Sequence, residues 1–388
     1  MTTTINNEHN KHNVPNLRFP EFQGEWEKCK LSEICTFFSG GTPSSSNKDF
    51  YGGNIAFIRS GELHADSTEL FITQAGFDSS SAKMVEVGDL LFAMYGATSG
   101  DIAVSKIKGA INQAILCIRT KQKKKFIESV WNKHVSKNLR TYLQGGQGNL
   151  SADIVKGISF FFPTLKEQKK IANLVSLLDE RITTQNKIID KLQSLIKGIV
   201  DCTILRKEKN AIVGDVCSIS EQIRAEANID DIITVRLHGN GVCKSSAENL
   251  QLGATQYYRR KAGQLIYGKQ NFHNGAIGIV PISLDNGITS KDIPSFDIDE
   301  MKCNSVYLLA QLQSPQYYKP AEALTTGTGS KRLKEETFLK MPIVLPNKRE
   351  QDNIAVLIHR ASMNLDHAKR LLELLSIQKQ FLLRQMFI

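Results

Sequence analysis

The chain has 388 residues and is 41% hydrophobic, so it is long enough for two globular domains that each bury a core. Its formal net charge of +10 suits a polyanionic partner, although many unrelated soluble proteins are also basic. The seven cysteines form no CxxC pair, which favours reduced thiols over a disulfide framework or a zinc site. The apolar runs are too short to span a membrane, and the start of the chain shows no secretory signal. We therefore expect a cytoplasmic protein without a membrane partner.

The predicted elements divide the chain into five parts. These are a leader (1–24), a first domain (25–163), a first long helix (164–208), a second domain (209–345) and a second long helix (346–388). In the first domain, apolar runs of strand length such as Ile55–Ile58 and Leu90–Met94 lie between glycine-rich turns. A helix around Phe126–Leu143 and a strand at Ile158–Phe162 complete this domain.

The first long helix is repeated at the C-terminus. Residues 163–168 read Pro-x-x-x-Glu-Gln, and residues 346–351 repeat the pattern at an offset of 183 residues that needs no gap. Apolar residues keep a 4-3 spacing in both copies, which indicates a coiled-coil seam, because the stripe of an ordinary surface helix drifts at 3.6 residues per turn. The predicted seam residues are Ile171, Val175, Leu178, Ile182, Ile189, Leu192, Ile196, Ile354, Ile358, Leu365, Leu372, Leu375 and Leu382.

Two matching helices in one chain pair most simply with each other. We expect an antiparallel intramolecular coiled coil about 60 Å long at 1.5 Å per residue, and a pseudo-twofold internal repeat. Gln185 and Lys379 are polar breaks in the seam, and each either sets the register or faces a partner.

The second domain repeats the order of the first with different residues. Val213–Cys217 corresponds to Leu31–Cys35, and Gly263–Tyr267 corresponds to Gly88–Phe92, whereas the loops between them differ. The predicted fold class is therefore α+β, with two mixed α/β recognition domains separated by the two long helices.

The sequence shows no pattern for catalysis or metal binding. It has no P-loop, no Asn/Asp-Pro-Pro-Tyr/Phe motif of an aminomethyltransferase and no HExxH or Cys/His ligand spacing. We therefore predict no catalytic residue and no metal site in this chain.

The loops carry residue types that contact nucleic acid: small donors, Asn and Gln for adenine, and Arg and Lys for guanine or phosphate. Plain turn chemistry is the competing interpretation of the Gly-, Ser- and Asn-rich loops. Candidates in the first domain are Ser39, Gly40, Gly41, Thr42, Ser44, Asn47, Lys48, Tyr51, Arg59, Tyr95, Thr98, Gln147 and Asn149. Candidates in the second domain are Arg236, His238, Tyr257, Tyr258, Arg259, Arg260, Lys269, Gln270, Asn271, His273, Asn274, Thr328, Ser330, Lys331 and Arg332.

The opening Val14–Phe22, the Gly40–Pro43 loop and the two Pro-x-x-x-Glu-Gln helix starts together resemble the specificity subunit of type I restriction-modification systems. The resemblance covers nearly the whole length. It implies two target-recognition domains that each read half of a split site in double-stranded DNA. The helices would set the gap and dock two modification (methyltransferase) subunits, with restriction subunits added for cleavage.

The resemblance further implies a non-catalytic chain that holds no cofactor, with S-adenosylmethionine, ATP and magnesium on the partner subunits. The second domain has Ser218–Gln222 where the first has its Gly-Gly-Thr-Pro loop, so loop roles do not transfer between the domains.

Two other functions remain open at this point. One is a stand-alone two-headed DNA-binding repressor or architectural protein. The other is a nuclease or methyltransferase with an unrecognised active site. Dependence on partner subunits distinguishes all three.

Overall fold

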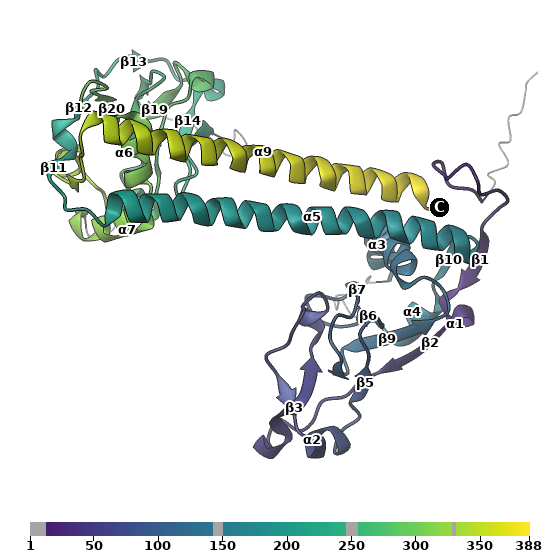
Figure 1. Cartoon of the computed structure of the whole chain (residues 1–388). Coiled ribbons are helices and arrows are strands. Elements are labelled where there is room, and N and C mark those ends of the chain that lie inside the picture. Colours follow the sequence, from purple (N-terminus) through teal and green to yellow (C-terminus); the bar gives the residue numbers. More distant parts are fainter. Residues whose placement is uncertain (1–12, 143–149, 246–254, 328–330) are drawn as a thin grey trace, which may run out of the picture. The chain divides into compact units, whose positions relative to one another are not determined.

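The computed structural model describes residues 13–142, 150–245, 255–327 and 331–388, with the backbone alone for 135–142. The chain divides into two compact units (Figure 1). The first unit comprises Met1–Thr184 with Leu372–Ile388, and the second comprises Gln185–Leu371. Each unit therefore contains one globular head and one part of each long helix.

The two long helices are α5 (Leu165–Val200) and α9 (Lys348–Met386), and α5 continues into a π-helical turn at Asp201–Leu205 (Figure 1). Both helices begin at a side-chain cap. The Thr164 hydroxyl accepts a hydrogen bond from Glu167 N at 3.4 Å, and Asn347 Oδ1 accepts one from Glu350 N at 3.0 Å. These bonds satisfy an amide that the first helical turn leaves unpaired, so the duplicated motif contains its own start signal.

The predicted seam is confirmed by burial along both helices. All thirteen predicted seam residues are buried or half-buried. The contrast with neighbouring leucines is large: Leu178 is 5% exposed beside Leu177 at 59%, and Leu375 is 5% exposed beside Leu374 at 63%.

The helices run antiparallel within each unit. In the first unit the start of α5 shares a core with the end of α9, through Ile171 and Met386. In the second unit the end of α5 shares a core with the start of α9, through Ile204 and Ile354. The predicted antiparallel coiled coil is therefore confirmed.

The two polar breaks in the seam make specific contacts. Gln185 is 8% exposed, and its Nε2 donates a hydrogen bond of 3.0 Å to the carbonyl oxygen of Ala368 on α9. Lys379 Nζ lies 2.6 Å from a carboxylate oxygen of Asp179 on α5, and Asp179 also pairs with Lys125 at 2.7 Å. Both breaks therefore link the two helices to each other, and such polar pairs favour one register over a slipped one.

In the described residues, the first head contains two four-stranded sheets, one two-stranded sheet and four short or medium α-helices. A four-stranded sheet has the order β2-β9-β6-β7, a second has the order β4-β3-β8-β5, and β1 pairs with β10. The strands are β1 (Glu27–Lys30), β2 (Cys35–Ser39), β3 (Tyr51–Ile58), β4 (Phe71–Ile72), β5 (Lys83–Val85), β6 (Leu90–Ala93), β7 (Ile102–Val104), β8 (Gly109–Ile111), β9 (Ile115–Thr120) and β10 (Ser159–Phe162). The helices are α1 (Leu31–Ile34), α2 (Gln74–Asp78), α3 (Lys124–Tyr142) and α4 (Ala152–Gly157).

Alternating side chains of the central strand β6 serve two separate cores. Leu90 and Phe92 pack with α3 and the long helices, and Leu91 and Ala93 pack against the second sheet. All four are 0% exposed, as expected for a strand covered on both faces.

The second head has a corresponding set of strands with different outer elements. Its four-stranded sheet has the order β12-β20-β17-β18, β11 pairs with β21, and smaller sheets are β13-β16-β19 and β14-β15. The strands are β11 (Ala211–Ile212), β12 (Cys217–Ile219), β13 (Arg224–Ala225), β14 (Ile233–Val235), β15 (Val242–Lys244), β16 (Tyr257–Arg259), β17 (Leu265–Tyr267), β18 (Ile277–Ile279), β19 (Ile288–Ser290), β20 (Ser295–Ile298) and β21 (Pro342–Ile343). The helices are α6 (Ser305–Leu312), α7 (Pro315–Tyr318) and α8 (Glu335–Leu339).

Sheet β2-β9-β6-β7 of the first head and sheet β12-β20-β17-β18 of the second head share one connectivity, which confirms the internal repeat. In chain order, the first strand pairs with the last, the last with the second and the second with the third, and all three pairings are antiparallel in both heads. Central strand β17 also divides its side chains between two cores, with Leu265 and Tyr267 in one and Ile266 in the other.

The glutamine of each Pro-x-x-x-Glu-Gln motif joins a long helix to its head. Gln168 Nε2 donates to the carbonyl oxygen of Pro163 at 2.8 Å, and its Oε1 accepts from Lys123 N at 3.1 Å, immediately before α3. Gln351 repeats this arrangement with the carbonyl oxygen of Pro346 at 2.8 Å and Asn304 N at 2.9 Å, immediately before α6. Both glutamines are 1% exposed. The glutamine of the motif is therefore explained as a buried hydrogen-bond bridge between the long helix and its head.

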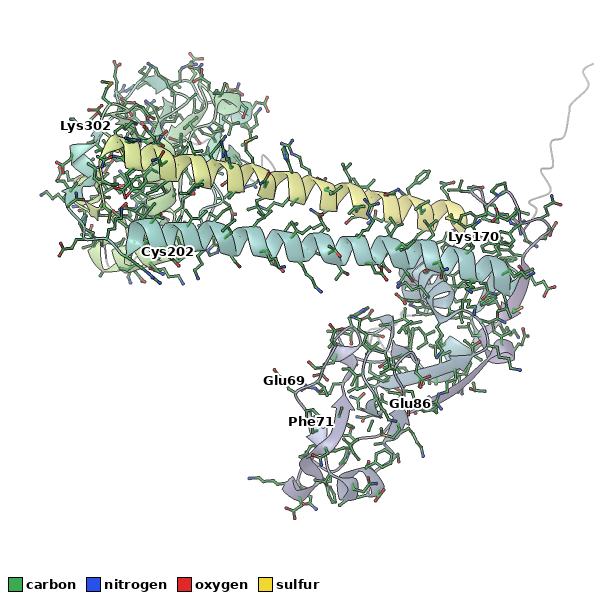
Figure 2. All side chains as sticks on the ribbon, in the orientation of Figure 1. Glu69, Phe71, Glu86, Lys170, Cys202 and Lys302 are labelled. Carbon is green, nitrogen blue, oxygen red and sulfur yellow. The ribbon has the colours of Figure 1, made fainter. Side chains whose placement is uncertain are left out.

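The glutamate of each motif pairs with the segment that leads into the head. Glu167 accepts two hydrogen bonds from the Arg18 guanidinium, at 2.7 and 2.8 Å. Glu350 pairs with Lys207. Figure 2 shows Lys170 on the first turns of α5, where it contacts Glu21 of the same leading segment.

Replacing Asp179 by asparagine should lower the stability of the first unit by about 1–3 kcal/mol at neutral pH, because two lysines lose their carboxylate. Burial raises the pKa of Asp179, but its bonds to Lys125 and Lys379 outweigh burial, so the folded-state pKa is lowered. The contribution is therefore present above the unfolded pKa of about 4 and lost as pH falls through the lower folded value. Thermal melts from pH 7 to pH 3 should show the two proteins converging in acid. Asp366→Asn, at an exposed position of α9, is the matched control.

Replacing Gln351 by methionine should destabilise the second unit by about 1–3 kcal/mol, since the amide of Asn304 and the carbonyl of Pro346 lose their buried partner. Gln168→Met should do the same in the first unit. Denaturation followed by hydrogen exchange assigns each loss to its unit. Equal protection of both units in both variants would contradict the bridge.

Candidate nucleic-acid interface

Loops that follow β2 and β6 of one sheet and β8 of the other sheet come together in the first head, held by backbone hydrogen bonds. The amide of Gly41 donates to Ile111 at 3.2 Å, and that of Met94 donates to Ala114 at 2.8 Å. Leu150, the first described residue after 143–149, donates to Met94 at 2.9 Å. The loops that follow β2, β6 and β8 therefore form one continuous surface, which we call the first loop surface.

Candidate residues on this surface are exposed or half-buried, and some of them are fixed by hydrogen bonds. Lys48 and Tyr95 are exposed and Thr98 is half-buried. The Thr42 hydroxyl bonds to Gln113, and the Tyr51 hydroxyl donates to the carbonyl oxygen of Pro43 at 2.7 Å. Ser39, Ser44 and Asn47 complete this group: Ser44 and Ser46 share a hydrogen bond of 2.7 Å, and Asn47 caps the short turn before β3. The positions of these residues agree with the prediction of a polar, solvent-accessible loop.

Gly40 and Gly41, which the sequence predicts as accessible loop residues, pack closely against neighbouring backbone. Both residues are buried. A Cβ on Gly40 would lie 1.8 Å from the carbonyl oxygen of Ile111, and a Cβ on Gly41 would lie 2.7 Å from the Ser81 side chain. These glycines are therefore required for close packing between the loop and the second sheet, and they do not offer backbone to a phosphate.

Two charged pairs lie next to this surface. Arg59 is held by Glu62 at 2.7 Å, and hydrogen bonds from Arg59 lower the pKa of Glu62. His64 Nε2 lies 2.9 Å from Asp101, the residue that follows the Tyr95–Gly100 loop, and this hydrogen bond raises the pKa of His64. His64 is therefore a titrating group beside candidate DNA contacts.

Corresponding loops meet in the second head. His238 N donates to Asn274 at 2.8 Å, Lys269 N donates to Asp292 at 2.9 Å, and Leu333 N donates to Lys269 at 2.9 Å. Lys269 follows β17 as Met94 follows β6, and Leu333 N bonds to it as Leu150 N bonds to Met94. We call this set the second loop surface.

Three candidate cations on the second loop surface are paired with acids. Lys269 lies 2.7 Å from Glu335, Lys331 lies 2.7 Å from Glu322, and Arg332 lies 3.2 Å from Asp292. The hydrogen bond from Lys331 lowers the pKa of Glu322. Arg236 and Arg259 are exposed and have no ion pair among the described residues.

The remaining candidates of this surface are polar. Gln270 and Asn271 are exposed, and Asn274 bonds to Asn271 at 3.1 Å. The backbone of His238 is left-handed, with φ of +59°, and its side chain is exposed. His273 is half-buried, and its Nδ1 has no hydrogen-bond partner among the described residues.

Tyr257, Tyr258 and Arg260, which the sequence predicts as accessible DNA contacts, are buried in the second head. The two tyrosines are each 6% exposed and Arg260 is 0% exposed. Tyr257 packs with Ile232 and Ile288, and the Arg260 guanidinium lies 5.7 Å from the Tyr258 ring. The aromatic and basic residues 257–260 predict an accessible loop, whereas β16 is the central strand of a three-stranded sheet.

Four candidates lie outside the described residues: Gln147, Asn149, Thr328 and Ser330. Two residues of the loop surfaces were missed from the sequence. Gln113 bonds to Thr42 from the loop between β8 and β9, and Lys291 is exposed in the loop between β19 and β20. Both loops precede the last strand of their four-stranded sheet, so the repeated strand order could have found them.

The described residues contain no group of three or more His, Cys, Asp or Glu side chains able to hold a metal ion. Within the same residues, no helix is long and apolar enough to cross a membrane.

Comparison with known proteins gives one consistent family. Residues 23–194 match the "Type I restriction modification DNA specificity domain". The "Type I restriction enzyme MjaVIII specificity subunit" of Methanocaldococcus jannaschii is 20% identical over 383 residues. The match covers 90% of this chain and 88% of the relative. The EcoR124I/EcoR124II specificity subunit of Escherichia coli is 28% identical over 187 residues, covering 45% of each chain.

A solved structure shares the fold over nearly the whole chain. The S subunit of a type I restriction-modification system from M. genitalium aligns with a TM-score of 0.66 at 12% identity, covering 97% of this chain and 99% of that one.

The His64 imidazole should titrate above its ordinary pKa of about 6.5, and Asp101→Asn should lower that pKa, because the hydrogen bond to Asp101 favours the protonated ring. The pair stabilises the loop fully below the unfolded pKa, and this contribution is lost as pH rises through the raised value. NMR titration of the imidazole signals measures both effects. Asp66→Asn removes a carboxylate that pairs with Lys106 and should change the His64 titration much less.

Proposed function

Because the chain belongs to the family of type I restriction-modification specificity subunits, we propose that each of its two heads reads one half of a bipartite DNA target. The observation that carries this proposal is the internal repeat. Two heads share one strand order, yet the loops at the same end of that sheet differ in every candidate contact. A shared scaffold with unlike loops suits two recognition surfaces of different specificity.

The contacts to bases come from the exposed members of the two loop surfaces. In the first head these are Thr42, Lys48 and Tyr95, and in the second Arg236, Arg259 and Gln270. Loss of a base contact costs about 1–3 kcal/mol of discrimination at one position, whereas loss of a phosphate contact weakens binding to all sequences.

The long helices set the gap between the half-sites and dock two modification subunits. Both helices expose large apolar side chains away from the seam, which marks surfaces for protein partners. These residues are Leu177, Ile188 and Leu195 on α5 and Val356, Leu357, Met363, Leu371, Leu374, Ile377 and Phe381 on α9. Restriction subunits join this assembly for cleavage.

Chemistry belongs to the partner subunits, which carry S-adenosylmethionine, ATP and magnesium. This chain is a non-catalytic specificity subunit that binds double-stranded DNA in the cytoplasm. Purified alone, it should neither methylate nor cut DNA. Methylation or cleavage by the isolated chain would overturn this assignment.

Methylome sequencing of cells that carry this chain with its modification subunits tests the proposal. The expected result is one methylated motif made of two short half-sites and a gap of fixed length. Gln270→Ala should change or relax the second half-site alone, and Thr42→Ala the first alone. A continuous motif, or a change in both half-sites from one substitution, would contradict two independent heads.

Lengthening the helix pair should lengthen the gap. Seven residues that continue the seam, inserted after Thr184 in α5 and after Leu371 in α9, add about 10 Å, or about three base pairs. The methylated motif should keep both half-sites and gain about three unspecified base pairs. Insertion into α5 alone shifts the register against α9 and should abolish methylation. An unchanged gap in the double insertion would rule out the spacer role.

A further inference from the structure

The second head has a small cleft whose surroundings carry unbalanced positive charge. It has a volume of about 260 Å³, and Gln222, Tyr258, Lys269, Lys291 and Glu335 are among its lining residues. Lys269 is 17% exposed and lies 2.7 Å from Glu335, so these two charges offset each other. Lys291 is exposed and has no ion pair or side-chain hydrogen bond among the described residues.

A fully buried arginine lies behind the cleft wall. The Arg260 guanidinium is 5.7 Å from the ring of Tyr258, and its Nη1 donates to Gln222 Oε1 at 3.3 Å, so it contacts two of the lining residues. Its other hydrogen bonds go to neutral oxygens: Thr289 Oγ1 at 2.7 Å, Ser295 Oγ at 2.9 Å and the Ile293 carbonyl at 3.0 Å.

No carboxylate pairs with Arg260 among the described residues. Burial lowers the pKa of Arg260 to about 10, so the group is still charged at neutral pH. A buried charge is normally paired, because an isolated one loses its hydration without compensation. The hydrogen bonds to neutral oxygens fix the guanidinium but supply no opposite charge, so the positive field reaches the cleft through low-dielectric side chains.

We infer that this cleft binds a phosphate group, held at its rim by Lys291 and drawn in by the buried Arg260 behind it. The phosphate is either a backbone phosphodiester of the DNA or free inorganic phosphate, since both present the same oxyanion. The cleft borders the second loop surface, because Lys269 belongs to both. The DNA source rests on the proposed function, whereas phosphate binding itself does not.

The first arm of the test measures DNA binding by the full chain with its modification subunits. Lys291→Gln should reduce the slope of log K against log salt by about one, and should weaken binding equally to DNA with the correct and with an altered second half-site. Lys340→Gln, at an exposed lysine of the same head outside the cleft, is the matched control and should keep the wild-type slope.

The second arm measures inorganic phosphate binding to the full chain without DNA, by calorimetry and by thermal melting at constant ionic strength against chloride. Wild type and Lys340→Gln should bind phosphate more tightly than Lys291→Gln. Arg260→Met removes four hydrogen bonds together with the charge, so its melting temperature is recorded first, and Lys291→Gln carries the test alone.

The two arms separate the outcomes. A reduced slope with weakened phosphate binding supports the site and assigns the DNA backbone as its ligand. Weakened phosphate binding with an unchanged slope supports the site and assigns free phosphate. If Lys291→Gln and Lys340→Gln behave alike in both arms, the inference is overturned. A chain that binds no DNA contradicts the proposed function, and the phosphate arm then decides this site by itself.

Discussion

The apolar seam between α5 and α9 is the constraint on which the rest of the structure depends. Each head closes its main core against the ends of these helices: Ile171 and Met386 complete one core, and Ile204 and Ile354 complete the other. A shift of one helix by a single residue would turn the seam toward solvent and remove apolar side chains from both cores. Gln185 and Lys379 weaken the seam as hydrophobic surface, but each has a polar partner in one register, so they favour specificity over stability.

Where each head meets the helices, a buried amide bridge adds to the apolar contact. Gln168 and Gln351 make the same two types of bond. One goes to the carbonyl of the proline that precedes the long helix, and the other comes from the amide that precedes α3 or α6. Such a bridge has definite geometry, because a buried amide without partners is costly. The bridges therefore hold each head to its own helix end, and the loops beyond the scaffold are free to vary.

The two loop surfaces show how one scaffold supports different recognition. In both heads the central strand is buried on both faces, so its sequence is restricted to apolar residues. Shortly after that strand, Met94 in the first head and Lys269 in the second each donate one backbone hydrogen bond and accept another. These bonds involve no side chain, so they are kept while the side chains change. The second head carries several cations that are paired with acids. Lys291 and the buried Arg260 are among those that have no carboxylate partner in the part of the chain that the structure describes.

The sequence by itself determined the periodic and repeated features: the seam, the pairing of the two long helices and the recurrence of strand segments along the chain. Periodicity and duplication can be recognised in the sequence itself, and the apolar side chains that carry them are favoured in a buried environment. The tertiary structure alone decided which polar and glycine residues face solvent. Gly40 and Gly41 were indistinguishable from flexible loop residues until the close approach of Ile111 and Ser81 was known. Likewise Arg260 is buried because Thr289, Ile293 and Ser295, some thirty residues away in the chain, supply the oxygens that replace water around its charge.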